Sequence, residues 1–358
     1  MHLGFYAPLK APDHPNPSGD RAMARALIAA LEYGGATVTL ASTLRSRDGT
    51  GDATLQRDLL AQAQAEITRL CGLGRAEGWQ AWITYHNYYK APDLIGPSVA
   101  RALGIPYLLI EASRARKRLT GPWARFAQAA ETASDAADVI FYFTHRDAET
   151  LERDRAGTQQ LIHLPPFLMR DSVDAAATPD GPMLAVGMLR AGDKLASYQI
   201  IADTLAQLPD TGWSLRIAGD GTARAKVEAL MAPFGPAVQF LGQLDATALT
   251  DVYRTSSLLF WPGVNEAFGL AYLEAQAAGL PVVAQDRPGV RDVLAPGDYP
   301  DPDKGAPALA ARLQQLLSDP ALRHRMGSAA QAHVAAHHLL PAASATLFSG
   351  LAKCGVYP

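Results

Sequence analysis

The chain has 358 residues, of which 48% are hydrophobic and 19% are charged, and its formal net charge is −3. This balance is typical of a soluble globular enzyme and excludes a disordered or fibrous chain. The small acidic excess argues against general nucleic-acid binding, which usually needs a basic surplus, so no nucleic-acid partner is expected. Because the chain is about twice as long as a usual domain, we expect two domains.

The cysteine count and the amino terminus indicate the compartment. Cys71 and Cys354 are too few for a disulfide framework, which favours a reducing environment. The opening MHLGFYAPLKAPDHP reaches two prolines and a lysine before a signal-peptide core could develop, and no later apolar run approaches membrane-spanning length. We therefore expect a cytoplasmic protein whose contact with a membrane, at its inner face, is at most peripheral.

Short runs of β-forming residues recur through the first half of the chain, namely HLGFYA, ATVTLA, AWITYH, PYLLIE and DVIFYFT. Alanine-rich stretches of helical composition separate these runs, which predicts a parallel, doubly wound α/β sheet. Residues 164–181 then interrupt the alternation with a segment rich in Pro, Asp and Ala. This composition is typical of a link between two domains.

The alternation resumes with MLAVGML, WSLRIAG, VQFLG, SLLFWP and PVVAQ, which predicts a second Rossmann-like domain. We thus expect an α/β protein with two tandem Rossmann-like domains, whose strands end at a cleft where ligands bind. The motif IAGDG follows one of these strands, and no dinucleotide fingerprint accompanies it. It is therefore expected to form a tight strand-to-helix turn.

Residues 265–284, NEAFGLAYLEAQAAGLPVVA, combine two glutamates with a Phe-Gly pair. Glu266 follows the strand SLLFWP and is expected in a loop, while Phe268 and Gly269 mark the start of a helix at Leu270. The amino end of a helix carries free N–H groups and partial positive charge, so it suits a phosphate. For an isolated pair of glutamates, an ordinary βαβ unit with two surface carboxylates would be the better interpretation.

The second glutamate, Glu274, lies about one turn inside this helix, where its carboxylate can accept from both hydroxyls of a ribose. The complete string resembles the signature of retaining GT-B fold glycosyltransferases, particularly of glycosyltransferase family four, in which EAFGLxxLEAxAxGxPVVA recurs. This resemblance implies the GT-B architecture: an acceptor domain over residues 1–170, a donor domain over residues 182–335, and a carboxyl-terminal helix, residues 336–358, that returns to the first domain.

The resemblance also implies which residues bind the nucleotide sugar. Arg190 and Lys194, in VGMLRAGDKLASY, would face the diphosphate, whose negative charge grows as it departs. Relatives usually carry GRLxxxKG, and here Met188 replaces the common arginine. Without the resemblance, two basic residues in a loop would be expected to be solvated. Gly242, in VQFLGQL, would border the nucleobase.

In the first domain, the resemblance places Gly19 against the donor phosphate and His86 near the transferred sugar. Ser18, which precedes this glycine, is also a good amino-terminal cap for the helix, an equally valid interpretation. Many relatives carry a further histidine where this chain has Glu111, so its role is either absent or passes to the glutamate. Tyr88 to Lys90 would form part of the acceptor side or pack at the domain rim.

Three other groups of charged residues leave alternatives open. The basic residues between Arg114 and Arg118 form either a solvated loop or a site for a phosphate-bearing acceptor or an anionic membrane surface. His333 and His337 have the spacing of a metal pair, but no carboxylate partner is near, so a surface helix is expected. Asp301 to Asp303, in a Pro-rich segment, form a turn and not a metal site. No metal and no cofactor is expected.

The resemblance implies a retaining glycosyltransferase of the hexosyltransferase type. It would move a sugar from a nucleotide-diphosphate donor to a hydroxyl of a glycan, a lipid-linked glycan or a small metabolite, including a phosphate-bearing acceptor. Alternatives are a nucleotide-sugar epimerase on the same fold and a non-catalytic nucleotide-sugar binding protein. The implied catalytic residues are Glu266, His86, Arg190 and Lys194. The implied donor contacts are Gly19, Arg190, Lys194, Gly242, Phe268, Gly269, Leu270 and Glu274.

Overall fold

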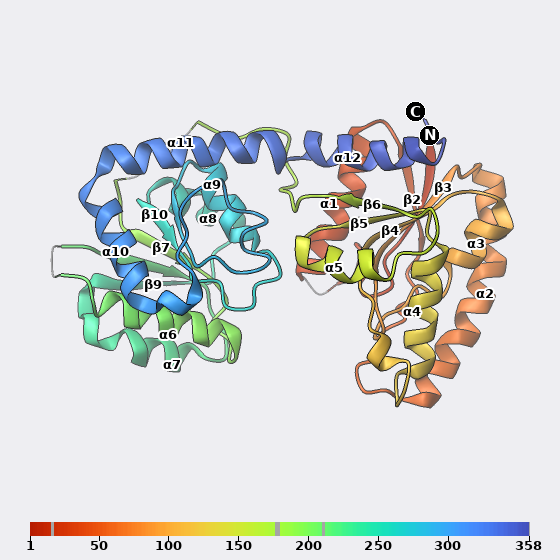
Figure 1. Cartoon of the computed structure of the whole chain (residues 1–358), viewed down its shortest axis with the longest axis horizontal. Helices are drawn as coiled ribbons and strands as arrows, with labels where there is room; N and C mark the ends of the chain where they lie inside the picture. The colour runs from red at the N-terminus through yellow and green to blue at the C-terminus, as the bar shows by residue number, and fades with distance from the viewer. Residues whose placement is uncertain (16–17, 176–179, 210–211, 358) are drawn as a thin grey trace. The chain divides into compact units, whose positions relative to one another are not determined.

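The computed structural model describes residues 1–15, 18–175, 180–209 and 212–357. The chain divides into two compact units, and each contains one parallel β-sheet with helices packed on it (Figure 1). The first unit comprises Met1–Pro165 and Leu340–Pro358, and the second comprises Pro166–Leu339. The expected link over residues 164–181 therefore belongs almost wholly to the second unit, and its residues 176–179 lie outside the described residues.

The first unit has a six-stranded sheet in the order β2-β1-β3-β4-β5-β6. Five strands follow the expected runs, and the central residues of β1, β3, β4 and β5 are buried, as in sheets covered on both faces, whereas those of the edge strand β2 are partly exposed. The sixth strand, β6, was not predicted, because its short sequence QLIH directly precedes the Pro-rich segment. The strands are β1 His2–Tyr6, β2 Thr37–Ser42, β3 Ala81–Asn87, β4 Tyr107–Ala112, β5 Val139–Tyr142 and β6 Gln160–His163.

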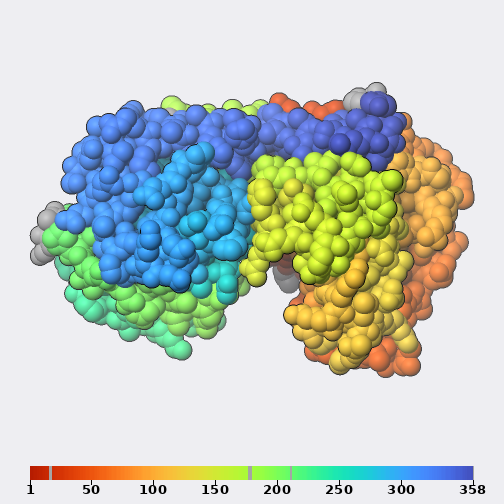
Figure 2. Space-filling model, in the orientation of Figure 1, coloured from red at the N-terminus to blue at the C-terminus, as the bar shows by residue number. Residues whose placement is uncertain are grey.

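The last helix of the chain packs within the first unit. A Cβ atom on Gly34, at the end of α1, would lie 2.2 Å from the ring of Phe348, and one on Gly350 would lie 2.3 Å from the ring of Phe141. The two glycines thus allow close packing of α12, whose dark blue residues lie at the surface of this unit (Figure 2). The helices of the unit are α1 Gly19–Tyr33, α2 Ala53–Glu77, α3 Gly96–Leu103, η1 Arg116–Arg118, α4 Ala124–Ala136, α5 His145–Arg153 and α12 Leu340–Lys353.

The second unit has a five-stranded sheet in the order β11-β10-β7-β8-β9. Its strands follow the five expected runs, and their apolar residues form one core with the surrounding helices. The strands are β7 Met183–Val186, β8 Leu215–Ala218, β9 Val238–Gly242, β10 Leu258–Phe260 and β11 Val282–Val283. The helices are α6 Asp193–Leu205, α7 Arg224–Met231, η2 Ala232–Ala237, α8 Ala246–Arg254, α9 Leu270–Ala277, η3 Pro302–Lys304, α10 Gly305–Ser318 and α11 Pro320–His337.

Both sheets act as rigid supports for the loops at the carboxyl ends of their strands. Leu184, Ile217 and Leu259 in the second unit are completely buried, and each such side chain contributes about 1.5–3 kcal/mol of transfer free energy. Ligands of parallel α/β sheets bind at these carboxyl ends. Among the described residues, no helix is both long enough and apolar enough to cross a bilayer.

Candidate functional site

Glu266 lies at the centre of a polar cluster in the second unit. Its Oε1 accepts a hydrogen bond of 2.9 Å from Nε1 of Trp261 and forms an ion pair with Nζ of Lys194. The Lys194 ammonium also lies 5.1 Å from the centre of the Trp261 ring, which is within cation–π range. The structure therefore joins Glu266 and Lys194, two of the residues that the resemblance implies to be catalytic, in one contact.

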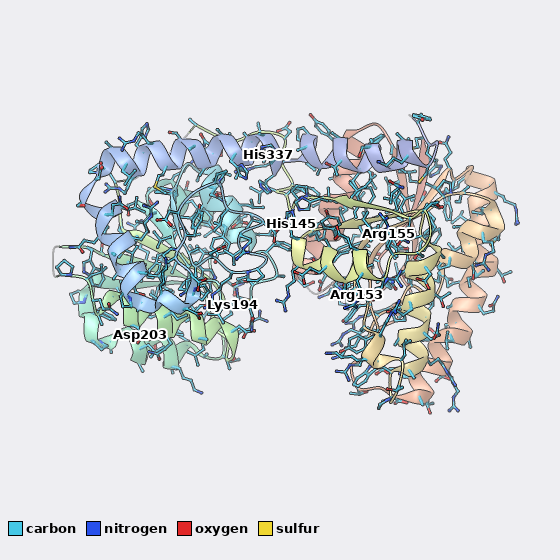
Figure 3. The ribbon with its side chains drawn as sticks, in the orientation of Figure 1. His145, Arg153, Arg155, Lys194, Asp203 and His337 are labelled. Atoms are coloured by element: carbon cyan, nitrogen blue, oxygen red, sulfur yellow. The ribbon has the colours of Figure 1, made fainter. Side chains whose placement is uncertain are left out.

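Lys194 occupies an electrostatically unfavourable place in its own helix. It lies in the first turn of α6 (labelled in Figure 3), where a cation opposes the helix dipole. An anion nearby offsets this cost, and Glu266 is that anion. Asp193, the first residue of α6, accepts a hydrogen bond of 3.0 Å from Nδ2 of Asn265, so the helix start is tied to the loop that carries Glu266.

That loop holds an unusual backbone conformation. Asn265 has a φ of 47°, which is uncommon for a residue with a side chain. Gly263 has a φ of 81°, and a Cβ atom there would lie 2.3 Å from the hydroxyl oxygen of Tyr272. Local strain of this kind persists where the surrounding structure fixes it, and it is common at functional sites. Here it directs Glu266 toward α6.

The aromatic support of this cluster was not predicted from the sequence. The rings of Trp261 and Tyr198 pack in an edge-type arrangement, with centroids 5.1 Å apart. The backbone carbonyl of Trp261 accepts a hydrogen bond of 3.0 Å from the hydroxyl of Tyr272. Tyr198 in turn donates to the carbonyl of Gly187 at 2.8 Å. A tryptophan that ends a buried strand five residues before a loop glutamate is the signal that could have identified Trp261.

The second glutamate of the motif lies on α9. This helix begins at Leu270, after Phe268 and Gly269, and the φ of Gly269 is 76°. Within the described residues, no side chain caps its amino end, so its first N–H groups are suited to an anion. The Oε2 atom of Glu274 accepts a hydrogen bond of 2.9 Å from the hydroxyl of Tyr253.

Opposing effects act on the pKa of Glu274. Burial raises it, while the hydrogen bond from Tyr253 and the charge of Arg170 act in the other direction, and the net shift is upward. Oε1 of this carboxylate makes no hydrogen bond within the part of the chain that the structure describes. This oxygen is the one suited to accept from a ligand hydroxyl.

The IAGDG motif forms the tight turn that was expected. A Cβ atom on Gly219 would lie 2.0 Å from the carbonyl oxygen of Gly187, and one on Gly221 would lie 2.4 Å from the carbonyl oxygen of Leu189. Glycine is therefore required for the close approach of this turn to the segment that carries Arg190. The amide of Gly219 also donates to the carbonyl of Gly242 at 2.8 Å.

The remaining expected donor residues of the second unit lie around this turn. Gly242 ends β9 with a φ of 71°, so its own backbone conformation requires glycine. The Arg190 side chain is exposed and forms no hydrogen bond or ion pair with the described residues. The structure thus does not bring Arg190 onto the Glu266 and Lys194 pair, and Met188, which replaces the usual arginine, is 52% exposed.

In the first unit, His86 and Glu111 form a strained pair. They lie at the carboxyl ends of the neighbouring strands β3 and β4, with φ angles of 74° and 58°. Nδ1 of His86 lies 3.5 Å from Oε2 of Glu111. The place where relatives carry another histidine is therefore occupied by a carboxylate that contacts His86.

The pKa of His86 is set by burial and by three carboxylates. Burial alone would lower the pKa of His86, but the nearby carboxylate of Glu111 and the charges of Asp20 and Asp147 raise it overall. The net shift therefore favours the protonated form of His86 more than in an ordinary histidine. A protonated imidazole can donate from both nitrogens, which suits the orientation of hydroxyl groups.

The start of α1 supports the capping interpretation of Ser18. Its hydroxyl oxygen accepts a hydrogen bond of 3.3 Å from the amide of Arg21. Gly19 is exposed, and a Cβ atom there would have no neighbour within 4 Å among the described atoms. Neither packing nor backbone conformation therefore requires this glycine, and its contact with a donor phosphate stays a prediction.

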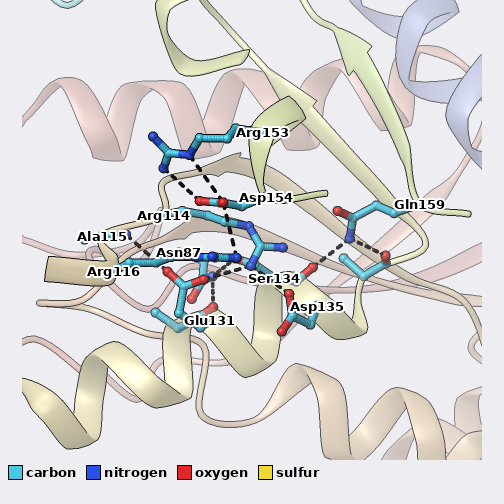
Figure 4. A network of polar contacts seen from close by, with 12 residues as sticks. Asn87, Arg114, Ala115, Arg116, Glu131, Ser134, Asp135, Arg153, Asp154 and Gln159 are labelled. Carbon is cyan, nitrogen blue, oxygen red and sulfur yellow. Dashed lines mark hydrogen bonds and ion pairs between the residues drawn. The ribbon is translucent and has the colours of Figure 1, made fainter. Parts of the chain in front are cut away.

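The basic segment after β4 is not simply a solvated loop, and that interpretation was wrong for Arg114. This side chain is buried and forms ion pairs of 2.8 Å with Glu131 and 2.7 Å with Asp135 (Figure 4). Arg116 lies 3.2 Å from Asp154. A buried arginine requires paired anions, and Glu131 and Asp135 of α4 provide them for Arg114. Together with the contact of Arg116, they link the basic segment to α4 and to the end of α5.

Two further expectations concern metal sites. The helix α11 is a surface helix, as expected, with His333 partly buried, whereas His338, which follows α11, is buried, with Nδ1 at 2.6 Å from the carbonyl of Pro166 and Nε2 at 3.3 Å from Nε2 of His333. His337, one residue earlier, is exposed (Figure 3). The turn at Asp301 is confirmed, because its carboxylate accepts a hydrogen bond of 2.8 Å from the amide of Asp303.

Parts of the chain are similar to known glycosyltransferases. Residues 190–333 match the family described as Glycosyl transferases group 1. The chain is 30% identical over 292 residues to D-inositol 3-phosphate glycosyltransferase of Streptomyces avermitilis, which covers 74% of this chain and 62% of that protein. It is 27% identical over 274 residues to alpha-D-kanosaminyltransferase of Streptomyces kanamyceticus, covering 68% and 70%. The chain thus spans less than two thirds of the length of the Streptomyces avermitilis relative.

Solved structures share the fold at low sequence identity. The sucrose-phosphate synthase from Thermosynechococcus elongatus superposes with a TM-score of 0.70 at 18% identity, over 99% of both chains. A glycosyltransferase from Rickettsia africae ESF-5 superposes with a TM-score of 0.73 at 14% identity, over 99% of this chain and 98% of the other. At these identities the likeness concerns the fold, which is GT-B, as the sequence predicted.

Proposed function

We propose that the protein transfers a sugar from a nucleotide-diphosphate donor to a hydroxyl acceptor, with retention of the anomeric configuration, because residues 190–333 match the family of group 1 glycosyl transferases and the chain has the GT-B fold. The observation that carries this proposal is the contact of Glu266 with Lys194 and Trp261, which the strained loop at Asn265 supports. The second unit binds the donor, and the first unit provides the acceptor side.

In this proposal, Lys194 exchanges its partner when the donor binds. The diphosphate attracts the ammonium of Lys194 and the N–H groups at the start of α9, which releases the Glu266 carboxylate to accept from sugar hydroxyls. Glu274 accepts from the ribose. The exposed Arg190 adds a second positive charge as the diphosphate departs, because charge stabilisation is most effective where charge develops.

The reaction itself needs no covalent intermediate. The bond between the anomeric carbon and the diphosphate oxygen breaks, the acceptor oxygen bonds to the same face of that carbon, and the acceptor proton passes to the departing phosphate oxygen. His86 orients hydroxyl groups, and Glu111 holds the imidazole in place. The acceptor is a hydroxyl of a glycan, a lipid-linked glycan or a small metabolite.

A panel of nucleotide sugars tests the proposal. A donor at 100 times its dissociation constant stabilises the folded protein by about 2.7 kcal/mol, so it is detected as a rise in melting temperature. We expect one donor to raise the melting temperature and to release its nucleoside diphosphate. Lys194→Met should lower this turnover, whereas Lys226→Met, at an exposed position on α7, should not. A panel in which no nucleotide sugar binds, or equal turnover in both variants, would contradict the proposal.

A further inference from the structure

We infer that the first unit contains an anion subsite, formed by Lys90, Arg118 and the rings of Tyr89 and Trp123, which selects an acceptor that carries a phosphate ester. This inference rests on the proposed function and specifies the chemical class of its acceptor. All four residues belong to the first unit: Tyr89 and Lys90 follow β3, Arg118 ends η1, and Trp123 directly precedes α4.

The four side chains form one stacked arrangement. The rings of Tyr89 and Trp123 meet edge to face, with centroids 5.9 Å apart. Nζ of Lys90 lies 5.7 Å and 5.5 Å from these two centroids, and the guanidinium carbon of Arg118 lies 5.2 Å and 5.4 Å from them. Both cations are therefore held against the same two rings, which fixes their positions before any ligand arrives.

These two positive charges have no anionic partner among the described residues. The neighbouring carboxylate of Asp48 is engaged elsewhere, since it accepts from the amides of Thr50 and Gly51 and from Nε2 of Gln56. Nε of Arg118 is buried and has no hydrogen-bond partner in the described ranges. Two like charges on one pair of rings repel each other, and a bound anion relieves this repulsion.

The rest of the basic segment shows that this arrangement is not general. Arg114 and Arg116 of the same segment are paired with carboxylates, as Figure 4 shows. Lys117 is exposed and makes no ring contact. Arg118 therefore differs from its neighbours in being both partly buried and without a counter-charge, which points to a ligand and not to a structural ion pair.

The subsite is continuous with the strained His86 and Glu111 pair. The His86 ring contacts the Tyr88 ring at 4.9 Å between centroids, and Tyr88 contacts Tyr89 at 5.7 Å. Burial raises the pKa of Tyr88, and the nearby positive charge of Arg47 opposes that rise. An acceptor whose phosphate binds Lys90 and Arg118 can thus extend along these rings toward His86.

The phosphate ester has two chemical sources, and the experiment separates them. One is a soluble sugar or cyclitol phosphate, and the other is the phosphodiester of a lipid head group. The soluble arm compares glucose with glucose 6-phosphate and myo-inositol with myo-inositol 3-phosphate, by calorimetry and by the kcat/KM of transfer. The lipid arm measures sedimentation with phosphatidylcholine vesicles that contain or lack phosphatidylinositol.

The variant that tests the subsite is Lys90→Gln combined with Arg118→Gln, and Lys117→Gln is its matched control. We expect the phosphate-bearing member of a soluble pair, or the vesicle with phosphatidylinositol, to bind about ten- to a hundredfold more tightly, as expected for hydrogen bonds to charged groups. The double variant should lose this preference, and Lys117→Gln should keep it. The single variant Lys90→Gln, which leaves Arg118 packed on the rings, serves if the double variant does not fold.

Each outcome bears on one proposal. Loss of the preference in the double variant supports the subsite, and the arm in which it occurs identifies the source of the phosphate. A wild-type protein that binds a nucleotide sugar but shows no phosphate preference in either arm overturns the subsite and leaves the proposed function intact. Equal loss in Lys117→Gln also overturns it, because the effect is then general surface charge. A protein that binds no nucleotide sugar overturns the proposed function instead.

Discussion

His86 combines three features that rarely coincide in one residue: a left-handed backbone, a half-buried ring and a carboxylate contact. Because its pKa is raised on folding, the protonated form stabilises the folded state. That stabilisation is fully present below the ordinary pKa of about 6.5 and is lost as the pH rises through the higher pKa of the folded protein. The groups responsible are Glu111, Asp20 and Asp147.

Glu111→Gln should reverse this shift. With the largest opposing charge removed, burial dominates, so the pKa of His86 should fall relative to the wild type. Titration of the imidazole by NMR gives the value directly, and the other histidines serve as internal controls. An unchanged pKa for His86 in the variant would show that Glu111 does not hold its proton.

The two glutamates of the EAFGLAYLE motif should respond differently to loss of charge. Glu274→Gln should weaken nucleoside diphosphate binding by about 1–3 kcal/mol, because a charged hydrogen bond to the ribose is lost. Glu266→Gln should not weaken that binding, since the variant frees Lys194 for the diphosphate, but it should lower kcat strongly. Calorimetry and steady-state kinetics measure both effects, and the reverse pattern would refute these two roles.

Sequence reasoning identified both glutamates and Lys194, but it did not predict the direct contact between Glu266 and Lys194. The motif predicts positions along the chain, whereas the contact depends on the strained loop at Asn265 and on Trp261, which hold distant segments together. Glu111 was left open for the same reason. Its pairing with His86 follows from the register of two strands, and no local pattern encodes that register.

At the scale of elements, Gly219, which was expected in a tight turn, and Gly19, which was expected against the donor phosphate, occur for different physical reasons. Gly219 is required by its neighbours, since its φ is 144° and the carbonyl oxygen of Gly187 occupies the place of a Cβ atom. Gly19 has open space around it. Substitution of Gly219 should therefore change the stability of the fold, whereas substitution of Gly19 should change ligand binding.

Alanine substitution separates the two cases. A strained backbone position usually costs about 1–3 kcal/mol, and in Gly219→Ala a steric clash adds to this cost. Gly219→Ala should therefore lower the free energy of unfolding by at least this amount. Gly19→Ala should leave stability unchanged or raise it by up to about 1 kcal/mol, and should lower donor turnover. Urea denaturation and initial rates measure the two effects. Normal turnover in Gly19→Ala would remove this residue from the donor site.

Most elements could be predicted because their periodic patterns are local. Ten of the strands follow runs visible in the sequence, and α9 begins where Gly269 indicates. The strand β6 and the buried His338 could not be predicted, because tertiary packing decides their burial and outweighs a polar or Pro-rich context.

At the scale of the whole molecule, the account needs no divalent metal. In the proposed site, positive charge at the diphosphate would come from Lys194, Arg190 and the start of α9, and the Asp301 carboxylate is engaged in its own turn. Transfer should therefore persist in excess EDTA, and Asp301→Ala with Asp303→Ala should behave like the wild type. Activity that is lost in EDTA and restored by manganese or magnesium would show that the diphosphate site has been misassigned.

The central claim is that this chain breaks the glycosidic bond of a nucleotide sugar and retains the configuration at the anomeric carbon. Water can replace the acceptor, so the claim can be tested before the natural acceptor is known. Proton NMR, recorded during the first minutes after enzyme is added to the donor found in the panel, distinguishes the anomers of the released sugar before they interconvert. The account predicts that the anomer with the donor's configuration forms first, together with the nucleoside diphosphate. Initial formation of the opposite anomer would contradict it.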